Sequence, residues 1–162
     1  MRALLTALTA LMLCSAPSTA KDLEDAFAAY KAGDYQRAFR LLAPQAKQGH
    51  AEAQFNLGMM YFKGNGVQKD YGKAMHWYRR AAERGHAEAQ SNLGLMYATG
   101  LGVSRDFVEA YAWWDIATEQ GNDDAKHNKT ILEYRMKSEQ IAKAKGLSSV
   151  YWEMYVMPFQ YY

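Results

Sequence analysis

Four histidines are the side chains of this chain best suited to metal binding or proton transfer: His50, His76, His86 and His127. His50 and His86 begin two copies of the same five-residue sequence, HAEAQ, placed 36 residues apart. Stacked helices pack about 10 Å apart, which is too far for equivalent residues to share one metal ion. We therefore interpret these histidines as polar residues at helix starts and predict no metal site.

Two other patterns could suggest catalysis, but each has a structural interpretation. Residues 64–66 and 100–102 have the Gly-x-Gly spacing found in phosphate-binding loops. Such loops follow a strand, and no strand is predicted here. Asp123 and Asp124 are adjacent, so on a helix they face apart and suit its first turn instead. The single cysteine is Cys14, and no G-x-S-x-G sequence is present. We predict no catalytic residues, no cofactor and no enzymatic activity.

An internal repeat of 36 residues organises most of the chain. Residues 50–85 align with residues 86–121 without a gap and share 19 of 36 positions, counted along the sequence. Apolar residues recur with helical spacing twice in each copy, at Ala53, Leu57, Met60 and Tyr61 and then at Ala74, Trp77, Tyr78 and Ala81. Each copy therefore predicts two antiparallel α-helices joined by a turn.

Glycine and aspartate residues mark the ends and the contact points of these helices. Gly58 lies inside a helix, where it costs about 1 kcal/mol relative to alanine, so we expect a neighbouring helix to approach closely there. Gly64 can adopt the left-handed conformation that ends a helix. Asp70 is placed to cap the second helix, and Gly85 ends it.

The pattern A-x-A-x-x-x-L-G-x-x-Y-x-x-G-x-G-V-x-x-D-x-x-x-A-x-x-W resembles the Sel1-like repeat, a relative of the tetratricopeptide repeat. Residues 22–49 are similar to a degenerate tetratricopeptide unit, and residues 122–149 look like the capping helices that close such arrays, with Asn128 in phase with Asn56 and Asn92. The resemblance implies an all-α fold, an α/α superhelical solenoid of about four antiparallel helix pairs over residues 21–149.

An apolar stripe on the first helix of the repeat is a candidate binding surface for a partner protein. Phe55, Met59 and Phe62 form this stripe at i, i+4 and i+7. Matching to tetratricopeptide units places it on the concave side, together with Phe27, Tyr30, Leu95, His127, Ile131 and Tyr134. Such a groove would suit a helix or an extended peptide. The alternative is that these side chains pack between helices.

The C-terminal residues 150–162 are unusually aromatic. Six of the thirteen are aromatic, namely Tyr151, Trp152, Tyr155, Phe159, Tyr161 and Tyr162. Because such a segment would be sticky in water, we predict a tail that docks through Tyr151, Trp152, Tyr155 and Phe159. It would fold back over the last helix pair or fill the groove. Binding to a partner or to a membrane surface is the alternative.

Residues 1–20 have the features of a secretory signal peptide. A positive start at Arg2 precedes an apolar run, and Ser18-Thr19-Ala20 provides a small-residue cleavage site. We predict cleavage after Ala20 and a periplasmic or secreted product. Lipidation at Cys14 is the less favoured alternative, because Leu13 precedes it.

These features together predict a non-enzymatic protein-interaction adaptor or regulator of the bacterial cell envelope. Sel1-like proteins typically serve as adaptors, so the resemblance implies that the partner is another protein, and we expect a protein of the cell envelope. The net charge of only +2 disfavours nucleic acid, and no membrane-spanning segment is predicted after signal cleavage. The alternatives are a hydrolase acting on cell-wall or β-lactam substrates and a self-assembling structural repeat protein.

Overall fold

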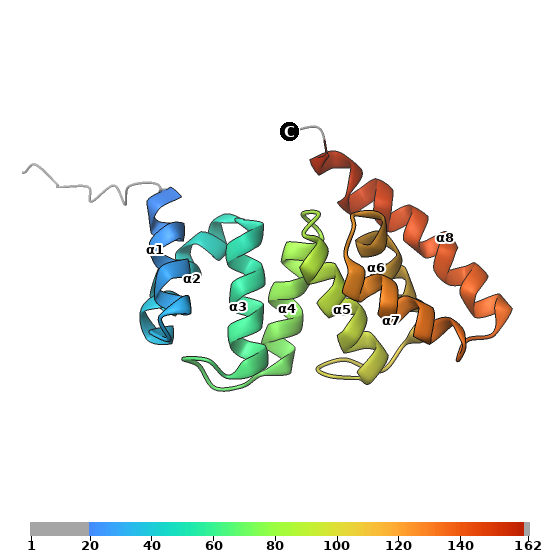
Figure 1. Cartoon of the computed structure of the whole chain (residues 1–162), viewed down its shortest axis with the longest axis horizontal. Coiled ribbons are helices and arrows are strands. Elements are labelled where there is room, and N and C mark those ends of the chain that lie inside the picture. The colour runs from blue at the N-terminus through green and yellow to red at the C-terminus, as the bar shows by residue number, and fades with distance from the viewer. Residues whose placement is uncertain (1–19, 161–162) are drawn as a thin grey trace, which may run out of the picture.

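The computed structural model describes residues 20–160, which form eight α-helices and no strand (Figure 1). The helices are α1 (Ala20–Lys31), α2 (Tyr35–Gln48), α3 (Ala51–Lys63), α4 (Tyr71–Ala82), α5 (Ala87–Thr99), α6 (Phe107–Glu119), α7 (Asp123–Glu133) and α8 (Ser138–Tyr155). A short 3-10 helix, η1 (Met157–Phe159), follows α8. The predicted signal peptide up to residue 19, with Cys14, lies outside the described residues, as do Tyr161 and Tyr162.

Capping residues determine where the repeat helices begin and end. At the start of α4, Asp70 accepts a hydrogen bond of 2.9 Å from a backbone N–H of the first turn. Asp106 does the same for α6 at 3.1 Å. Gly64 and Gly100 end α3 and α5 with φ of 78°, a left-handed conformation that other residues rarely adopt. The predicted caps at Asp70 and Gly64 are therefore confirmed.

The two helices of each central repeat approach each other at a glycine. A Cβ atom at Gly58 would lie 2.5 Å from the Tyr78 ring, and one at Gly94 would lie 2.5 Å from the Trp114 indole. Real carbon atoms pack about 3.5–4.0 Å apart, so only glycine fits against these rings. The close helix approach predicted from Gly58 is confirmed.

The hydrophobic core runs along the stacked helices in two clusters. The first cluster joins α1, α2 and α3 around buried residues such as Leu42 and Leu57, and the second extends from α4 to η1. Helix α6 is buried on most of its surface, because α5, α7 and α8 all pack against it. The predicted all-α superhelical solenoid is confirmed.

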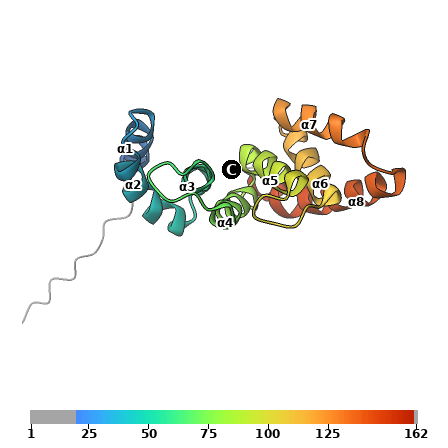
Figure 2. The same ribbon diagram turned by 90° about the horizontal axis from the view of Figure 1, so that it is seen from below.

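The last two helices differ from the antiparallel pair that we expected. Helix α8 packs along α6 and hardly contacts α7, so α7 and α8 lie on different sides of α6 (Figure 2). Asp115 of α6 connects to both, since its carboxylate accepts hydrogen bonds from Lys129 at 2.7 Å and from Ser148 at 2.6 Å. Residues 20–160 therefore form three helix hairpins followed by two helices that both pack against α6.

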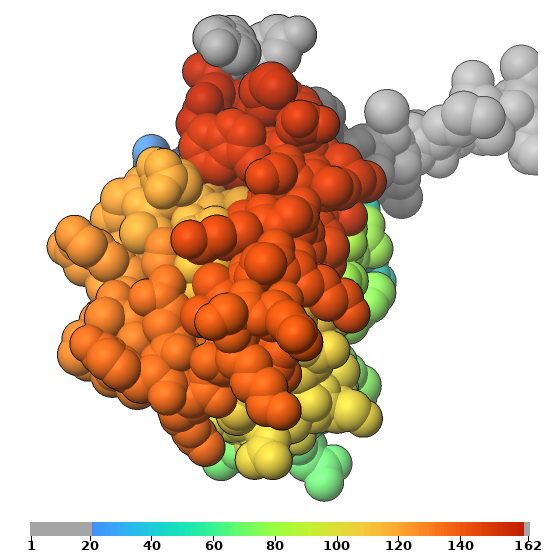
Figure 3. Space-filling model, turned by 90° about the vertical axis from the view of Figure 1, so that its right-hand side faces the viewer, coloured from blue at the N-terminus to red at the C-terminus, as the bar shows by residue number. Residues whose placement is uncertain are grey.

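The predicted boundary at residue 149 falls inside α8. Residues 150–155 are the last turns of this helix, which continues because no proline occurs before Pro158. Residues of α7 and α8 form much of the surface at this end of the molecule, with yellow residues of the preceding elements visible below them (Figure 3). Among the described helices, none has the length and apolar character needed to cross a membrane.

Candidate partner-binding surface

The first helix of each unit contributes to a concave face. In Figure 2, α1 and α7 project to the same side of α3 and α5. The 36-residue period brings polar residues of α3, α5 and α7 to equivalent positions, forming a carboxylate row of Glu52, Glu88 and Asp124 and an asparagine row of Asn56, Asn92 and Asn128. The sequence already showed Asn128 in phase with Asn56 and Asn92, but neither row is among the binding residues predicted from it.

Two hollows open on this face between neighbouring first helices. The hollow between α1 and α3 has a volume of about 240 Å³ and is lined by Phe27, Tyr30, Lys31, Glu52 and Asn56. The next, of about 190 Å³, lies where α3, α5 and α7 meet and is lined by Phe55, Glu88, Ser91, Asn92, Asn122 and Asp124. The hollows are mixed in character, with aromatic walls and polar edges.

The predicted apolar stripe on α3 is mostly engaged in packing between helices. The Phe55 ring stacks on His86 at 4.7 Å and lies 5.9 Å from Tyr78. Phe62 lies 5.3 Å from Tyr71 of α4, and Met59 packs against the same core. The packing alternative therefore describes most of this stripe, although Phe55 also reaches the second hollow.

The remaining predicted concave residues divide into packed and exposed ones. Phe27 and Tyr30 line the first hollow, and the Tyr30 hydroxyl accepts a hydrogen bond of 3.3 Å from Asn65. Leu95 is half-buried against the core. On α7, by contrast, His127 is exposed, Ile131 is half exposed and Tyr134 is 87% exposed. The structure therefore brings Phe27 and Tyr30 together, whereas the α7 residues stand apart at the far end.

The predicted tail residues lie on the outer side of the solenoid, over α6. The Tyr151 and Tyr155 rings lie 4.5 Å and 5.7 Å from the Trp113 ring. The Tyr151 hydroxyl donates a 3.0 Å hydrogen bond to Glu109, and burial raises the pKa of Tyr151. Trp152 is half-buried. No residue of 150–160 lines either concave hollow, so the described part of the tail covers α6 and leaves the groove open.

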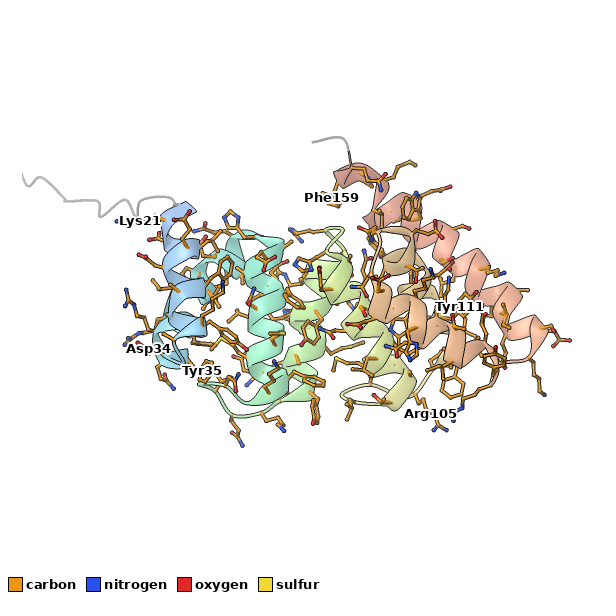
Figure 4. The ribbon with its side chains drawn as sticks, viewed as in Figure 1. Lys21, Asp34, Tyr35, Arg105, Tyr111 and Phe159 are labelled. Atoms are coloured by element: carbon orange, nitrogen blue, oxygen red, sulfur yellow. The ribbon has the colours of Figure 1, made fainter. Side chains whose placement is uncertain are left out.

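The far end of the tail reaches the turn between α4 and α5. Phe159, labelled in Figure 4 at the end of η1, lies against Gly85 in the turn after α4. Helix α4 itself ends at Ala82 with Glu83 as its C-cap, so the expectation that Gly85 ends this helix is wrong. Val156 is buried in the larger core cluster. The aromatic segment thus covers the outer surface of two successive units.

His86 links two units on the concave side. Its Nδ1 accepts a hydrogen bond of 3.3 Å from the Ala89 backbone N–H, which leaves Nε2 to donate to Glu52 at 2.9 Å. Glu88 lies 3.3 Å from Nδ1. The hydrogen bond from His86 lowers the pKa of Glu52 below its ordinary value, with help from Asn56. The imidazole therefore lies between two carboxylates and caps α5, as expected for a polar residue at a helix start.

The titratable groups do not gather into a reactive site within residues 20–160. In this part of the chain, no group of three or more His, Cys, Asp or Glu side chains is placed to hold a metal ion. The largest pKa changes belong to Tyr78, Tyr111 and Tyr151, whose pKa values are raised mainly by burial. These tyrosines pack in or against the core, so their perturbation has a structural cause.

The fold and these residues match proteins of one repeat family. The Sel1 repeat family model matches residues 28–50, 51–86 and 87–122. One similar structure is that of c5321, a protective antigen present in uropathogenic Escherichia coli strains and displaying an SLR fold. It has 34% identity and a TM-score of 0.82, and the match covers 85% of this chain and 30% of that chain. Another is a Sel1 repeat protein from Oxalobacter formigenes, with 32% identity and a TM-score of 0.67, covering 80% and 55%.

The chain thus spans about a third and about half of the length of these two proteins. No curated protein matches it. Sel1 repeat proteins generally mediate protein–protein interaction, and the family is typically non-catalytic. Three matched repeats cover more than half of the sequence, and the two structures are similar in fold as well as in sequence. The chain therefore belongs to the Sel1 repeat family.

Proposed function

We propose that this chain is a non-enzymatic adaptor that holds a segment of another protein on its concave face. The observation that carries the proposal is the pair of hollows between α1, α3, α5 and α7, which are edged by in-register carboxylate and asparagine rows. Repeated side chains on a curved surface can contact an extended segment at regular intervals. The outer side of α6 is already covered by α8, whereas the two hollows of the concave face are not lined by any residue of α8.

The test is a comparison of two arginine substitutions used as bait in an envelope extract. Asn92→Arg places a bulky cation in the second hollow, whereas Gln48→Arg changes an exposed residue of α2, away from both hollows. We expect the wild-type protein and Gln48→Arg to capture the same partner and Asn92→Arg to lose it. Equal capture by all three proteins would contradict a concave binding site.

We also propose that the adaptor acts in the cell envelope, in the periplasm or after secretion. The support is the sequence of residues 1–20, with a basic start, an apolar run and a small-residue site ending at Ala20. Sequencing the N-terminus of protein recovered from the envelope fraction should show Lys21 first. An uncleaved protein in the cytoplasm would contradict this proposal, and a lipid on Cys14 would support the alternative.

The non-enzymatic part of the proposal rests on how the polar side chains are used. His86 caps α5, Asp70 caps α4, and Asp115 joins α6 to its neighbours. These three acidic or basic side chains are thus engaged in capping helices or joining them. The purified protein should not hydrolyse cell-wall fragments or β-lactams. Turnover that co-purifies with the protein and is lost on substituting one of its residues would favour the hydrolase alternative.

Self-association is a second candidate function, favoured by one observation on the outside of α8. Val150, Met154 and Met157 recur with helical spacing and are 48%, 55% and 40% exposed, and Phe159 beside them is 49% exposed. An apolar row of this kind can bury itself against a second copy. Sedimentation over a range of concentrations would show a dimer that Met154→Lys abolishes, whereas a constant monomer mass would exclude this function.

A further inference from the structure

At the junction between α3 and α5, the imidazole of His86 lies between two carboxylates of the concave face. His86 donates from Nε2 to Glu52, and Glu88 faces the other ring nitrogen at 3.3 Å. The same ring lies flat against Phe55, with an interplanar angle of 22°. At this junction, therefore, the chain itself supplies a nitrogen donor to the carboxylate row.

The next junction, between α5 and α7, has the carboxylates without the donor. Asn122 occupies the position equivalent to His86, and its side chain accepts a hydrogen bond of 2.8 Å from the Ala125 backbone N–H. Glu88 and Asp124 occupy the positions equivalent to Glu52 and Glu88. Among residues 20–160, neither Asp123 nor Asp124 takes part in an ion pair.

Two adjoining hollows open at this junction. One, of about 240 Å³, is lined by Ala87, Glu88, Gln120, Gly121, Asn122, Asp123 and Asp124. The other is the 190 Å³ hollow beside Phe55, which shares Glu88, Asn122 and Asp124 with it. No lysine or arginine lines either hollow. The positive N-terminal ends of α5 and α7 offset this charge only in part, because each contributes about half a unit charge.

The opposite end of the groove between α5 and α7 has a different character. A hollow of about 100 Å³ lies there among Ala98, Phe107, Trp114, Asn128, Ile131, Leu132 and Arg135. Arg105 and Arg135 lie 5.4 Å and 5.2 Å from the Phe107 ring (Figure 4). The groove is thus acidic at the start of α7 and apolar with a basic edge toward its end.

From this polarity we propose that the groove between α5 and α7 binds an extended segment of the partner through a lysine or arginine side chain followed by an apolar one. The basic side chain lies between Glu88 and Asp124, as His86 lies between Glu52 and Glu88 one unit earlier. The apolar side chain enters the hollow at Ile131. This inference rests on the proposed adaptor function and specifies the chemistry of its partner.

The geometry of α7 gives the spacing of these two side chains. Asp124 and Ile131 are seven residues apart, or about 10 Å along the helix axis. A polyproline-type segment advances about 3.1 Å per residue and repeats every three residues, so side chains at i and i+3 lie on one side about 9 Å apart. The expected pattern in the partner is therefore basic-x-x-apolar.

The experiment uses a fluorescein-labelled synthetic peptide, Ser-Gly-Arg-Ser-Pro-Leu-Gly-Ser, and the purified full chain. Two control peptides replace Arg by Glu or Leu by Ser. The protein variants are Asp123→Asn/Asp124→Asn and, as a matched control, Glu139→Gln, which neutralises an exposed carboxylate in the first turn of α8. Helical circular dichroism checks that each variant is folded, fluorescence anisotropy gives the affinity, and amide NMR shifts locate the bound peptide.

We expect the Arg peptide to shift the amides of Glu88, Asn92 and Asp124 and to bind about fivefold more weakly to the doubly neutralised protein. Glu139→Gln should leave its affinity unchanged, and added salt should weaken it. Each control peptide should bind more weakly than the Arg peptide. Equal binding of the Arg and Glu peptides, or shifts confined to other surfaces, would overturn the inference.

A second arm separates this inference from the adaptor function itself. If Asn92→Arg abolishes capture of the natural partner while Asp123→Asn/Asp124→Asn does not, the concave adaptor function is supported. The inference that the partner binds through a basic side chain is then wrong. If both variants lose the partner while Glu139→Gln retains it, both statements are supported. If both variants capture the partner normally, both statements fail.

Discussion

The glycine at the crossing of α5 and α6 provides a stringent test of the packing argument. In an exposed helix interior, replacing glycine by alanine stabilises a protein by about 1 kcal/mol. At Gly94, however, the new Cβ would lie 2.5 Å from both Cδ1 and Nε1 of Trp114. The substitution Gly94→Ala should therefore destabilise the protein, contrary to its effect on helix propensity.

The expected loss in the free energy of unfolding follows from the displacement of the Trp114 indole. Trp114 has to move by about 1 Å to reach normal contact distance, and overpacking of this kind costs about 1–3 kcal/mol. The movement also disturbs the hydrogen bond of 2.9 Å from Trp114 Nε1 to the Ser91 carbonyl, which contributes about 1 kcal/mol. The gain in helix propensity, also about 1 kcal/mol, offsets the weakening of this hydrogen bond. We expect a net loss of about 1–3 kcal/mol.

The matched control is Gly146→Ala in α8. Gly146 is exposed inside the helix, and a Cβ atom there would meet nothing within 4 Å. Urea unfolding followed by circular dichroism at 222 nm should give a higher midpoint for this variant and a midpoint lower by about 1 M for Gly94→Ala. If Gly94→Ala were as stable as Gly146→Ala, the close approach of α5 and α6 would be refuted.

Three further predictions concern the end of the solenoid and the concave carboxylates. Asp115→Ala should lower the free energy of unfolding by about 2 kcal/mol, because Lys129, with its side chain only 17% exposed, would lose its partner; a urea midpoint equal to the wild type would contradict this. Glu52 has a lowered pKa, so its stabilising contribution is present above its ordinary pKa of 4.5 and is lost as the pH falls below that value. The difference in stability between the wild type and Glu52→Gln should therefore shrink on acidification through this range, and a pH-independent difference would argue against the pairing. Removing residues 150–160 should expose Trp113 and shift its fluorescence to longer wavelength with a loss of about 3 kcal/mol or more; unchanged fluorescence and stability would show that α8 does not cover it.

The architecture could be predicted because the residues that define helices and turns occur in both copies of the repeat. Ala53, Leu57 and Gly58 each recur 36 residues later, so helix spacing, helix ends and close approaches support one another. The prediction weakened at residues 122–155, where only a few positions of the repeat recur and the family model no longer matches beyond residue 122. Sequence periodicity identified helices there, but it carried no signal that α8 would pack along α6 in preference to α7.

The candidate site was predicted less well, since apolar stripes on adjacent faces of one helix look alike in sequence. Phe55 and Phe62 have the spacing of a groove-lining stripe, yet their rings contact Tyr78 and Tyr71 of the paired helix. The residues that distinguish the concave face are polar ones. Glu88 lies beside the start of α7 and lines two hollows there, a placement that only the structure shows.

The two repeat tryptophans show what the aromatic residues of α8 contribute to the packing. Trp77 and Trp113 occupy the same repeat position, but Trp77 remains half-buried with Arg80 at 5.5 Å, whereas Trp113 is 0% exposed. Trp113 belongs to the third matched repeat, at residues 87–122, and α8 packs along the same helix. Tyr151 and Tyr155 provide that cover from α8. The aromatic residues of α8 therefore cover the outer side of α6, as a capping helix does in repeat proteins, and none of residues 150–160 lines the two concave hollows.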